Sequence, residues 1–326
     1  MAKQRLRKDE LITLTFQLFW EEAHRLGRSS IQGISIPLDR VRRELAERTG
    51  TPRQNSKWIH TQIRKYEERE GVVLFRKTRD AGQNEALAIT EELLTFVQKR
   101  HLYRSEKIRL ANGAADLIEG EIAIPGERTS LFLGAGTTMA ILAEVLLSRI
   151  ENSACQLDIT THNMGVIETL THPNRCGERI RLFVAPGQFD PVTYALLSDA
   201  YDVPEEREFD LIIQGASAVH GGGVYIESAE ELPRKRAILE RLHGPKLLVL
   251  TLHEFFPDLP DGMRRFGDLA AFDFLVAPRV KRPLENQARG IRMLDAPDSG
   301  FRATITGWHY RILTRDGAPV EMPEGV

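Results

Sequence analysis

Short apolar segments that end in glycine-rich or polar turns, each followed by a helical stretch, constrain the fold of this chain most. After Pro125, apolar segments lie at residues 131–133, 157–160, 182–184, 211–213 and 247–252, and helical patterns cover residues 139–147 and 233–242. Such alternation is typical of a mainly parallel sheet covered by helices. The sequence therefore predicts an α/β domain here. Residues 301–320 instead predict a terminal β-hairpin.

Charge divides the chain into two unlike parts. Residues 1–110 carry 23 Lys and Arg against 15 Asp and Glu, a net of +8, whereas the remainder carries 21 against 31, a net of −10. A basic part joined to an acidic part is typical of proteins that bind nucleic acid and have a second function. Chance variation of charge between domains is the alternative.

The basic part has the pattern of a helix-turn-helix followed by a two-stranded wing. Helical spacing covers residues 9–26, residues 27–36 form a loop, and a second helix ends at Gly50. Thr51-Pro52 predicts the N-cap and first position of a third helix, which ends at Gly71. Residues 72–75 and 86–89 then predict two strands joined by a turn at 80–84. In this arrangement the last helix enters the major groove of DNA.

Polar side chains on the third helix and the wing suit contacts with DNA. Arginine bonds guanine, and Gln or Asn bonds adenine, in bidentate fashion, while basic groups beside them contact phosphates. The alternative is an ordinary solvated helix face. The predicted DNA-contacting residues are Arg53, Gln54, Asn55, Lys57, His60, Thr61 and Arg64 on the helix, with Arg76, Lys77 and Arg79 on the wing.

Residues of this basic part resemble the LysR-type winged helix-turn-helix. The resemblance rests on the run from Ile63 to Arg76, with its glutamates, Gly71 and the Leu74-Phe75 pair, and on Ala88-Ile89-Thr90-Glu91 at the end of the wing. It covers about residues 38–95, and it implies double-stranded DNA as a partner.

Four turns in the acidic part are candidates for a ligand site. Gly134-Ala135-Gly136-Thr137-Thr138 follows a strand and begins a helix, so its free N–H groups suit a phosphate or carboxylate, although tight turns also use glycine for structure. The carboxyl ends of parallel strands meet at one edge of a sheet, where ligands bind. The predicted ligand residues in the other turns and the following helix are Thr161, His162, Asn163, Gly187, Gln188, Gly215, Ser217 and Lys235.

The same segments, in this order, resemble the effector-binding domain of the DeoR family of transcription regulators. The matching segments are the helix from Lys107 to Ile118, the Gly134 to Thr138 turn, Thr161-His162-Asn163, Phe209 to Ser217, and Glu231 with Lys235 to Ala237. The resemblance covers about residues 104–278 and implies the fold of ribose-5-phosphate isomerase and CoA transferases, used to bind an effector without catalysis.

Two positions differ from that family, and they leave the ligand open. Gly134 stands where the family has aspartate, and the family's late Asp-x-x-Lys-Phe is Thr251-Leu252-His253-Glu254-Phe255 here. A phosphorylated sugar, a nucleotide or another polar metabolite therefore fits the resemblance.

The resulting domain prediction has four segments. They are a winged helix-turn-helix over residues 1–90, a linker helix over 91–120 with a break near His101, the isomerase-like α/β domain over 121–278, and an unassigned β-rich extension over 279–326. The predicted protein is a ligand-responsive DNA-binding regulator, with an isomerase, deaminase or nucleoside hydrolase that uses Glu227, Glu230 or Glu231 as the alternative. A structural partner in a larger assembly is a third possibility.

Several further expectations concern partners and location. DNA readers gain specificity as dimers, so we expect a homodimer or a higher even-numbered oligomer that uses Leu93, Leu94, Phe96 and Val97. The longest uncharged stretch, residues 211–226, is too short to cross a bilayer. A charged start and two cysteines without metal spacing predict a cytoplasmic protein with no secretory signal, cofactor or metal.

Overall fold

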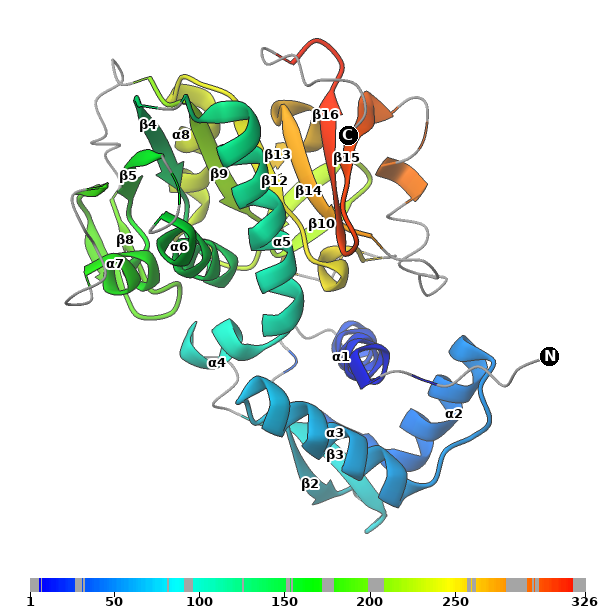
Figure 1. Cartoon of the computed structure of the whole chain (residues 1–326). Helices are drawn as coiled ribbons and strands as arrows, with labels where there is room; N and C mark the ends of the chain where they lie inside the picture. The colour runs from blue at the N-terminus through cyan, green and yellow to red at the C-terminus, as the bar shows by residue number, and fades with distance from the viewer. Residues whose placement is uncertain are drawn as a thin grey trace.

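The computed structural model describes residues 6, 8–26, 31, 33–80, 82–90, 96–124, 126–150, 153, 155–171, 179–198, 208–256, 259, 262–279, 292–294, 296 and 299–318. Figure 1 shows two parts joined by a helical connection. We call residues 8–90 the N-terminal module and residues 104–318 the α/β body.

The N-terminal module combines three helices with a small antiparallel sheet. Its described elements are α1 (Lys8–Arg25), β1 (Ser35–Pro37), α2 (Leu38–Thr49), α3 (Ser56–Glu70), β2 (Phe75–Arg79) and β3 (Glu85–Ile89), with strand order β1-β3-β2. Leu11, Leu18 and Phe19 of α1 share one core with Ile63 and Tyr66 of α3. The helical periodicity of residues 9–26 thus predicted the helix and its face toward the module core, but not that residues 11–19 are buried on every side.

Three predictions for this module were wrong in their boundaries. The third helix begins at Ser56, because the Asn55 side chain caps it by accepting from the Trp58 N–H at 2.7 Å, while buried Thr51 bonds back to Thr49. The expected loop 27–36 includes the start of β1, which pairs with β3. The first wing strand begins at Phe75 rather than residue 72.

The late start of β2 has a local cause. The Glu67 carboxylate of α3 accepts from the N–H groups of Leu74 at 2.8 Å and Phe75 at 3.1 Å. Val72 and Leu74 are buried in the module core. The Glu67 carboxylate therefore accepts the hydrogen bonds that the carbonyl groups of a neighbouring strand would otherwise accept.

The connection between the two parts is helical, with one interruption in its described portion. The helix α4 (Phe96–His101) is followed by α5 (Arg104–Leu117), which continues as the π-turn η2 (Ile118–Ile122). Tyr103 has a left-handed φ of 55° at the interruption. The predicted break near His101 is confirmed, while residues 91–95 lie outside the described residues.

The α/β body is built on a mainly parallel sheet, as predicted. Within the described residues this sheet has eight strands in the order β15-β16-β14-β12-β9-β4-β5-β6, of which β15 and β16 are antiparallel to their neighbours. The strands are β4 (Arg128–Leu133), β5 (Gln156–Thr161), β6 (Ile180–Val184), β9 (Leu211–Gly215), β12 (Lys246–Val249), β14 (Phe274–Pro278), β15 (Phe301–Thr306) and β16 (Tyr310–Arg315). The predicted terminal hairpin is confirmed and extends this sheet.

Helices cover both faces of the sheet (Figure 1). Leu131 and Leu133 of β4 share a core with α5, α6 (Thr137–Ile150) and α7 (Met164–Thr171), whereas Phe132 shares a core with Ile238 of α8 (Leu232–Arg241). Adjacent strand residues point to opposite faces, so α8 lies opposite α5 and α6.

Smaller elements complete the described part of the α/β body. They are β7 (Gln188–Asp190), β8 (Ala195–Leu197), β10 (Ala218–His220), β11 (Gly223–Ile226), η3 (Leu252–Glu254), β13 (Arg264–Asp268) and η4 (Leu269–Ala271). The expected strand 247–252 is shorter than predicted, because Thr251 and Glu254 form a capping box that begins η3.

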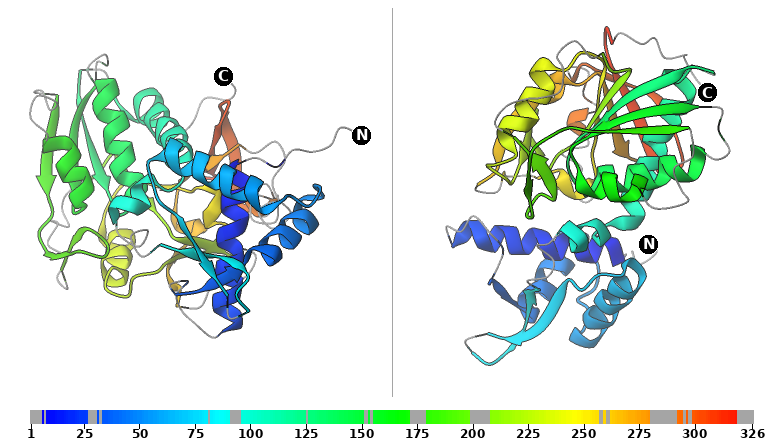
Figure 2. Two further views of the ribbon diagram at one scale, coloured as in Figure 1. Left: turned by 90° about the horizontal axis from the view of Figure 1, so that it is seen from below. Right: turned by 90° about the vertical axis from the view of Figure 1, so that its left-hand side faces the viewer.

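The N-terminal module meets the α/β body through α1 and α4. The right-hand view of Figure 2 places these two helices along the boundary between the parts. Among the helices of the described chain, none combines the length and apolar character that a membrane crossing needs.

Candidate functional site

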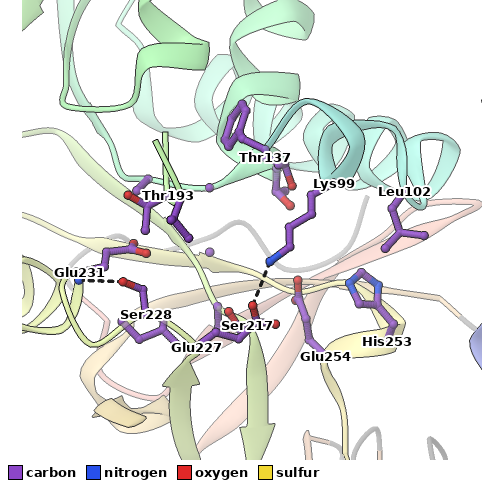
Figure 3. A pocket seen from close by; sticks show the side chains of 18 of the residues that line it. Lys99, Leu102, Thr137, Thr193, Ser217, Glu227, Ser228, Glu231, His253 and Glu254 are labelled. Carbon is purple, nitrogen blue, oxygen red and sulfur yellow. Dashed lines mark hydrogen bonds and ion pairs between the residues drawn. The ribbon is translucent and has the colours of Figure 1, made fainter. Parts of the chain in front are cut away.

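A cavity of about 550 Å3 lies where the N-terminal module meets the α/β body. Its walls come from α1, α4 and the start of α5, and from the carboxyl ends of β4, β9 and β12. Figure 3 shows it as elongated, with Leu102 and His253 at one end, Thr193 and Glu231 at the other, and Lys99 and Thr137 between them.

The N-terminus of α6 forms one wall of the cavity. Gly136, Thr137 and Thr138 line it, and Gly136 has a φ of 111° that side-chain-bearing residues rarely adopt. The first N–H groups of a helix have no partner within the helix, and the helix dipole is positive at this end. This wall is therefore suited to an anion.

Lys107 of α5 brings a buried ammonium to the same wall. Its Nζ donates to Thr137 Oγ1 at 2.9 Å and to the Lys99 carbonyl at 2.7 Å. An ammonium has three protons, so within the described residues one N–H is left for a ligand. Burial lowers the pKa of Lys107 to about 8, and most molecules carry its charge at neutral pH.

Lys235 of α8 is held by protein groups. Its Nζ donates to Gln214 Oε1 at 2.9 Å and to the Gly215 carbonyl at 2.7 Å, and lies 3.7 Å from Glu231. Burial lowers the pKa of Lys235 and raises that of Glu231. These contacts fix the turn after β9 against α8.

Glu254 and His253 close the cavity from the β12 side. Glu254 accepts from the Thr251 N–H at 2.7 Å, and burial raises its pKa to about 8, so it is mostly protonated at neutral pH. The His253 ring stacks on Tyr103 at 4.0 Å, and burial holds the pKa of His253 well below its usual value. Both side chains therefore add little charge beside Lys107.

An ion pair crosses the middle of the cavity. Lys99 Nζ of α4 lies 2.9 Å from Glu227 Oε2, just after β11 (Figure 3). Both side chains are partly exposed, so the pair contributes little to stability. An entering anion would compete with Glu227 for Lys99.

A family model describes the part of the chain that carries most of this cavity. The model of the DeoR C terminal sensor domain matches residues 103–276, more than half of the chain. The chain belongs to this family. Membership indicates a ligand-sensing transcription regulator, and it favours a regulatory sensor over the enzyme alternative.

The chain also has weak similarity to several solved structures. Ribose 5-phosphate isomerase A from Methanocaldococcus jannaschii is 12% identical, with a TM-score of 0.34 over 67% of this chain and 81% of that one. The eIF2B delta structure from Chaetomium thermophilum is 13% identical, with a TM-score of 0.32 over 54% and 61%. No curated protein matches the chain. At these scores the structures carry no conclusion about activity.

Seven of the predicted ligand residues line the cavity of the sensor domain. They are Ala135, Gly136, Thr137, Thr138, Gly215, Ser217 and Lys235. The turns after β4 and β9 therefore converge, as neighbouring parallel strands require.

Thr161 and Asn163 lie behind that wall and support it. Asn163 Nδ2 donates to the carbonyls of Gly134 at 3.2 Å and Gly136 at 2.9 Å, while its Oδ1 accepts from the Gly165 N–H at 2.9 Å. Thr161 Oγ1 donates to the Leu133 carbonyl at 2.6 Å. Both residues are fully buried, so they hold the shape of the glycine turn.

The remaining predicted ligand residues are also away from the cavity. His162 is buried next to Phe132, and its pKa lies well below the usual value because of burial. A Cβ at Gly187 would lie 2.7 Å from the backbone of β8, so no side chain fits there, while Gln188 is exposed on β7. At Gly134 a Cβ would lie 2.8 Å from Gln214 Oε1, so Gln214 fills the space that a side chain there would need.

The sequence interpretation missed several lining residues. Lys107 had a signal, because a lysine at helical spacing with Leu110, Ala111 and Ala114 lies on the buried face of α5. Thr13, Phe16 and Gln17 had none, because nothing in the spacing of α1 shows that it adjoins the α/β body.

The predicted DNA-contacting residues divide into three groups. Lys57, His60, Thr61, Arg64 and Lys77 line one groove between α3 and the β2–β3 hairpin. Arg76 and Arg79 are exposed elsewhere on β2. Arg53, Gln54 and Asn55 precede α3: Arg53 pairs with Asp39, Gln54 bonds the Pro52 carbonyl, and Asn55 is the N-cap.

Two further predictions, on the oligomer surface and on metal binding, can be compared with the described residues. Phe96 is buried and stacks on Tyr194 at 4.9 Å, so it does not offer an oligomer surface in this conformation. Leu93, Leu94 and the Val97 side chain lie outside the described residues. Within the described parts of the chain, no three His, Cys, Asp or Glu side chains cluster in a way that suits a metal ion.

Proposed function

We propose that the protein is a DNA-binding transcription regulator whose affinity for duplex DNA responds to a small anionic metabolite, a phosphorylated sugar or a nucleotide. The N-terminal module acts as a winged helix-turn-helix, and the sensor domain holds the effector without catalysis. The single observation that carries the anion assignment is the buried Lys107 ammonium beside Thr137 at the start of α6.

The anion site has several donors that converge on one wall. The N-terminal N–H groups of α6, the hydroxyl groups of Thr137 and Thr138, and Lys107 Nζ all adjoin the same cavity. Charge-assisted bonds of this type are about twice as strong as neutral ones. A phosphate ester is therefore the ligand that best fits this wall.

The DNA-binding assignment rests on the groove beside α3. Exposed Lys57, Arg64 and Lys77 present positive charge on both sides of that groove, and half-buried His60 and Thr61 lie between them. Phosphate contacts position a protein on DNA, and side chains of a groove-bound helix read bases. We further propose a homodimer or higher even-numbered oligomer, since paired half-sites raise specificity.

The test combines a DNA selection with a ligand titration of the full chain. A random duplex library should yield a preferred sequence, and ribose 5-phosphate or inorganic phosphate should raise the thermal unfolding midpoint by mass action. Thr138→Val removes a hydroxyl at nearly constant volume, so it should weaken phosphate binding by about 1–3 kcal/mol and leave folding largely unchanged. No enriched duplex and no phosphate-dependent stabilisation would contradict the proposal.

A further inference from the structure

A carboxyl group of η3 reaches the cavity from another side than the anion-binding wall. Glu254 lines the cavity, and Figure 3 shows its side chain directed into the middle of it, toward Lys99. Glu254 Oε2 accepts from the Thr251 N–H at 2.7 Å, whereas Oε1 has no hydrogen-bond partner within the described residues and keeps accessible surface. The residue as a whole is only 5% exposed, so this oxygen opens toward the cavity rather than toward bulk solvent.

Lys107 connects this carboxyl group with the proposed anion site. The Lys107 ammonium acts electrostatically on Glu254, and it donates to Thr137 Oγ1 at the start of α6. An anion held by Lys107 and the start of α6 would therefore lie beside the Glu254 carboxyl group. One cavity thus brings an acid and an anion together.

The chemistry of two oxygen acids decides how they can meet. An ionised carboxylate and a phosphate dianion only accept hydrogen bonds, and their like charges repel. A protonated carboxyl group instead donates its O–H, and a bond from O–H to an ionised oxygen is among the strong ones. Contact between Glu254 and a bound anion therefore requires a proton on the carboxyl group.

The surroundings of Glu254 favour that proton. Burial raises the pKa of Glu254 to about 8, the Glu106 carboxylate of α5 raises it further, and the bonds to Thr251 and the charge of Lys107 lower it. Most molecules therefore carry a neutral Glu254 at neutral pH, as a buried acid that donates a hydrogen bond must. The other titratable side chains that line this part of the cavity are Lys99, Tyr103, Glu227 and His253.

We propose that Glu254 is a ligand-binding residue of the sensor, whose neutral carboxyl group donates a hydrogen bond to an oxygen of the bound phosphate ester. This deepens the proposed function and rests on it. In molecules where Glu254 is ionised, one proton passes from the solvent to Glu254 Oε1 as the anion binds. The site therefore senses the anion and the proton together, and its affinity falls in alkaline solution.

Proton uptake on binding tests this assignment. Isothermal titration calorimetry of the full chain with ribose 5-phosphate and with inorganic phosphate, at pH 8 in two buffers of different ionisation enthalpy, counts the protons taken up. Lys107 and Glu254 are each about half protonated at pH 8, so the wild type should take up about one proton per anion. In Glu254→Gln the amide oxygen can accept from Thr251 while the amide N–H donates without titrating. Uptake should then fall to about half a proton, the share of Lys107.

The affinities should follow with a defined sign. At pH 7 Glu254→Gln should bind ribose 5-phosphate within about threefold of the wild type, because both side chains donate. At pH 9.5 it should bind at least about fivefold more tightly than the wild type, because no negative charge develops beside the anion. Glu240→Gln makes the same exchange on the exposed side of α8, away from the cavity, and should change neither affinity nor proton uptake.

A spectroscopic measurement keeps the test decisive if Glu254→Gln folds poorly. Infrared difference spectra of the wild type at pH 8.5 should gain a protonated-carboxyl band when ribose 5-phosphate binds. Equal proton uptake in the wild type and a folded Glu254→Gln, or binding without that band, would overturn the role of Glu254 and leave the anion sensor standing. If neither ribose 5-phosphate nor inorganic phosphate binds, the proposed function fails and this inference falls with it.

Discussion

The backbone N–H of Tyr103 donates to the hydroxyl of Tyr66 at 3.0 Å, and this bond joins the cavity wall to α3. Tyr103 lines the cavity and stacks on His253, whereas Tyr66 is buried on the inner side of α3. Phe16, beside Tyr103, also packs on Phe75 at the start of β2 with ring centres 5.1 Å apart. Both predicted DNA-contacting elements therefore directly contact residues that line the cavity.

Tyr66→Phe tests this connection. Removal of the hydroxyl leaves the buried Tyr103 N–H without that acceptor, so the free energy of unfolding should fall by about 1–3 kcal/mol. Urea denaturation of both proteins measures the loss. Hydrogen exchange of α3 should also respond less to a bound phosphate ester than in the wild type. If Tyr66→Phe and the wild type have the same free energy of unfolding and the same hydrogen-exchange response, the bond does not couple the cavity to α3.

Lys107 gives the anion site a pH dependence with a defined sign. The protonated amine carries the charge, and its pKa is lowered to about 8, so affinity for ribose 5-phosphate should be full near pH 7 and weaken as the pH rises through about 8. The phosphate is already dianionic there, because its second pKa is about 6. In Lys107→Met the affinity should be lower and should decline less between pH 7 and 9.5, the remaining decline coming from Glu254, whose pKa of about 8 lets it gain negative charge there, as calorimetry would show. A parallel decline in both proteins would assign the effect to another group.

Asn163 is expected to act through the glycine turn rather than through the ligand. Asn163→Leu removes three buried hydrogen bonds to the backbone of residues 134–136 and 165, so it should cost at least about 2 kcal/mol of stability. Thr138→Val, on the cavity side of the same turn, serves as the comparison. Thermal unfolding should separate them, with a large fall for Asn163→Leu and a small one for Thr138→Val. Equal stabilities would contradict the supporting role.

The groove beside α3 is predicted to provide salt-sensitive contacts. Lys57→Ala and Lys77→Ala should each weaken binding to all duplex sequences alike and reduce the slope of log affinity against log salt by about 1. Arg241→Ala, exposed at the end of α8 in the α/β body, is the matched control and should change neither quantity. Fluorescence anisotropy at several salt concentrations measures both. A slope that is the same in all four proteins would place the DNA contacts elsewhere.

The sequence predicted the α/β body more accurately than the N-terminal module for a physical reason. Buried strands and glycine turns such as Gly134 to Thr138 carry local signals, and parallel topology then brings the turns after β4 and β9 together. The start of α3 was wrong because Thr51 and Asn55 are both good caps, and the choice depends on the bond between Thr51 and Thr49. The α1 wall of the cavity depends on how the two parts dock, and no local pattern encodes that.

The same distinction explains why some predicted ligand residues lie away from the cavity. Asn163 was predicted to face a ligand because of its polar chemistry, yet its amide bonds the carbonyls of Gly134 and Gly136 behind the cavity wall. A sequence shows which residues follow a strand but not which of them turn inward. Lys107 was overlooked although its position among alanines and leucines of α5 makes it a buried charge.

A DNA titration with and without a bound anion shows whether binding in the cavity changes the affinity for DNA. The dissociation constant for a duplex selected from a random library is measured by anisotropy, with and without a saturating amount of the probe that binds most tightly. We predict a change of at least about fivefold in the wild type, typical of allosteric coupling, and no change in Lys107→Met. Equal dissociation constants in the wild type, with the probe shown by calorimetry to be bound, would contradict it.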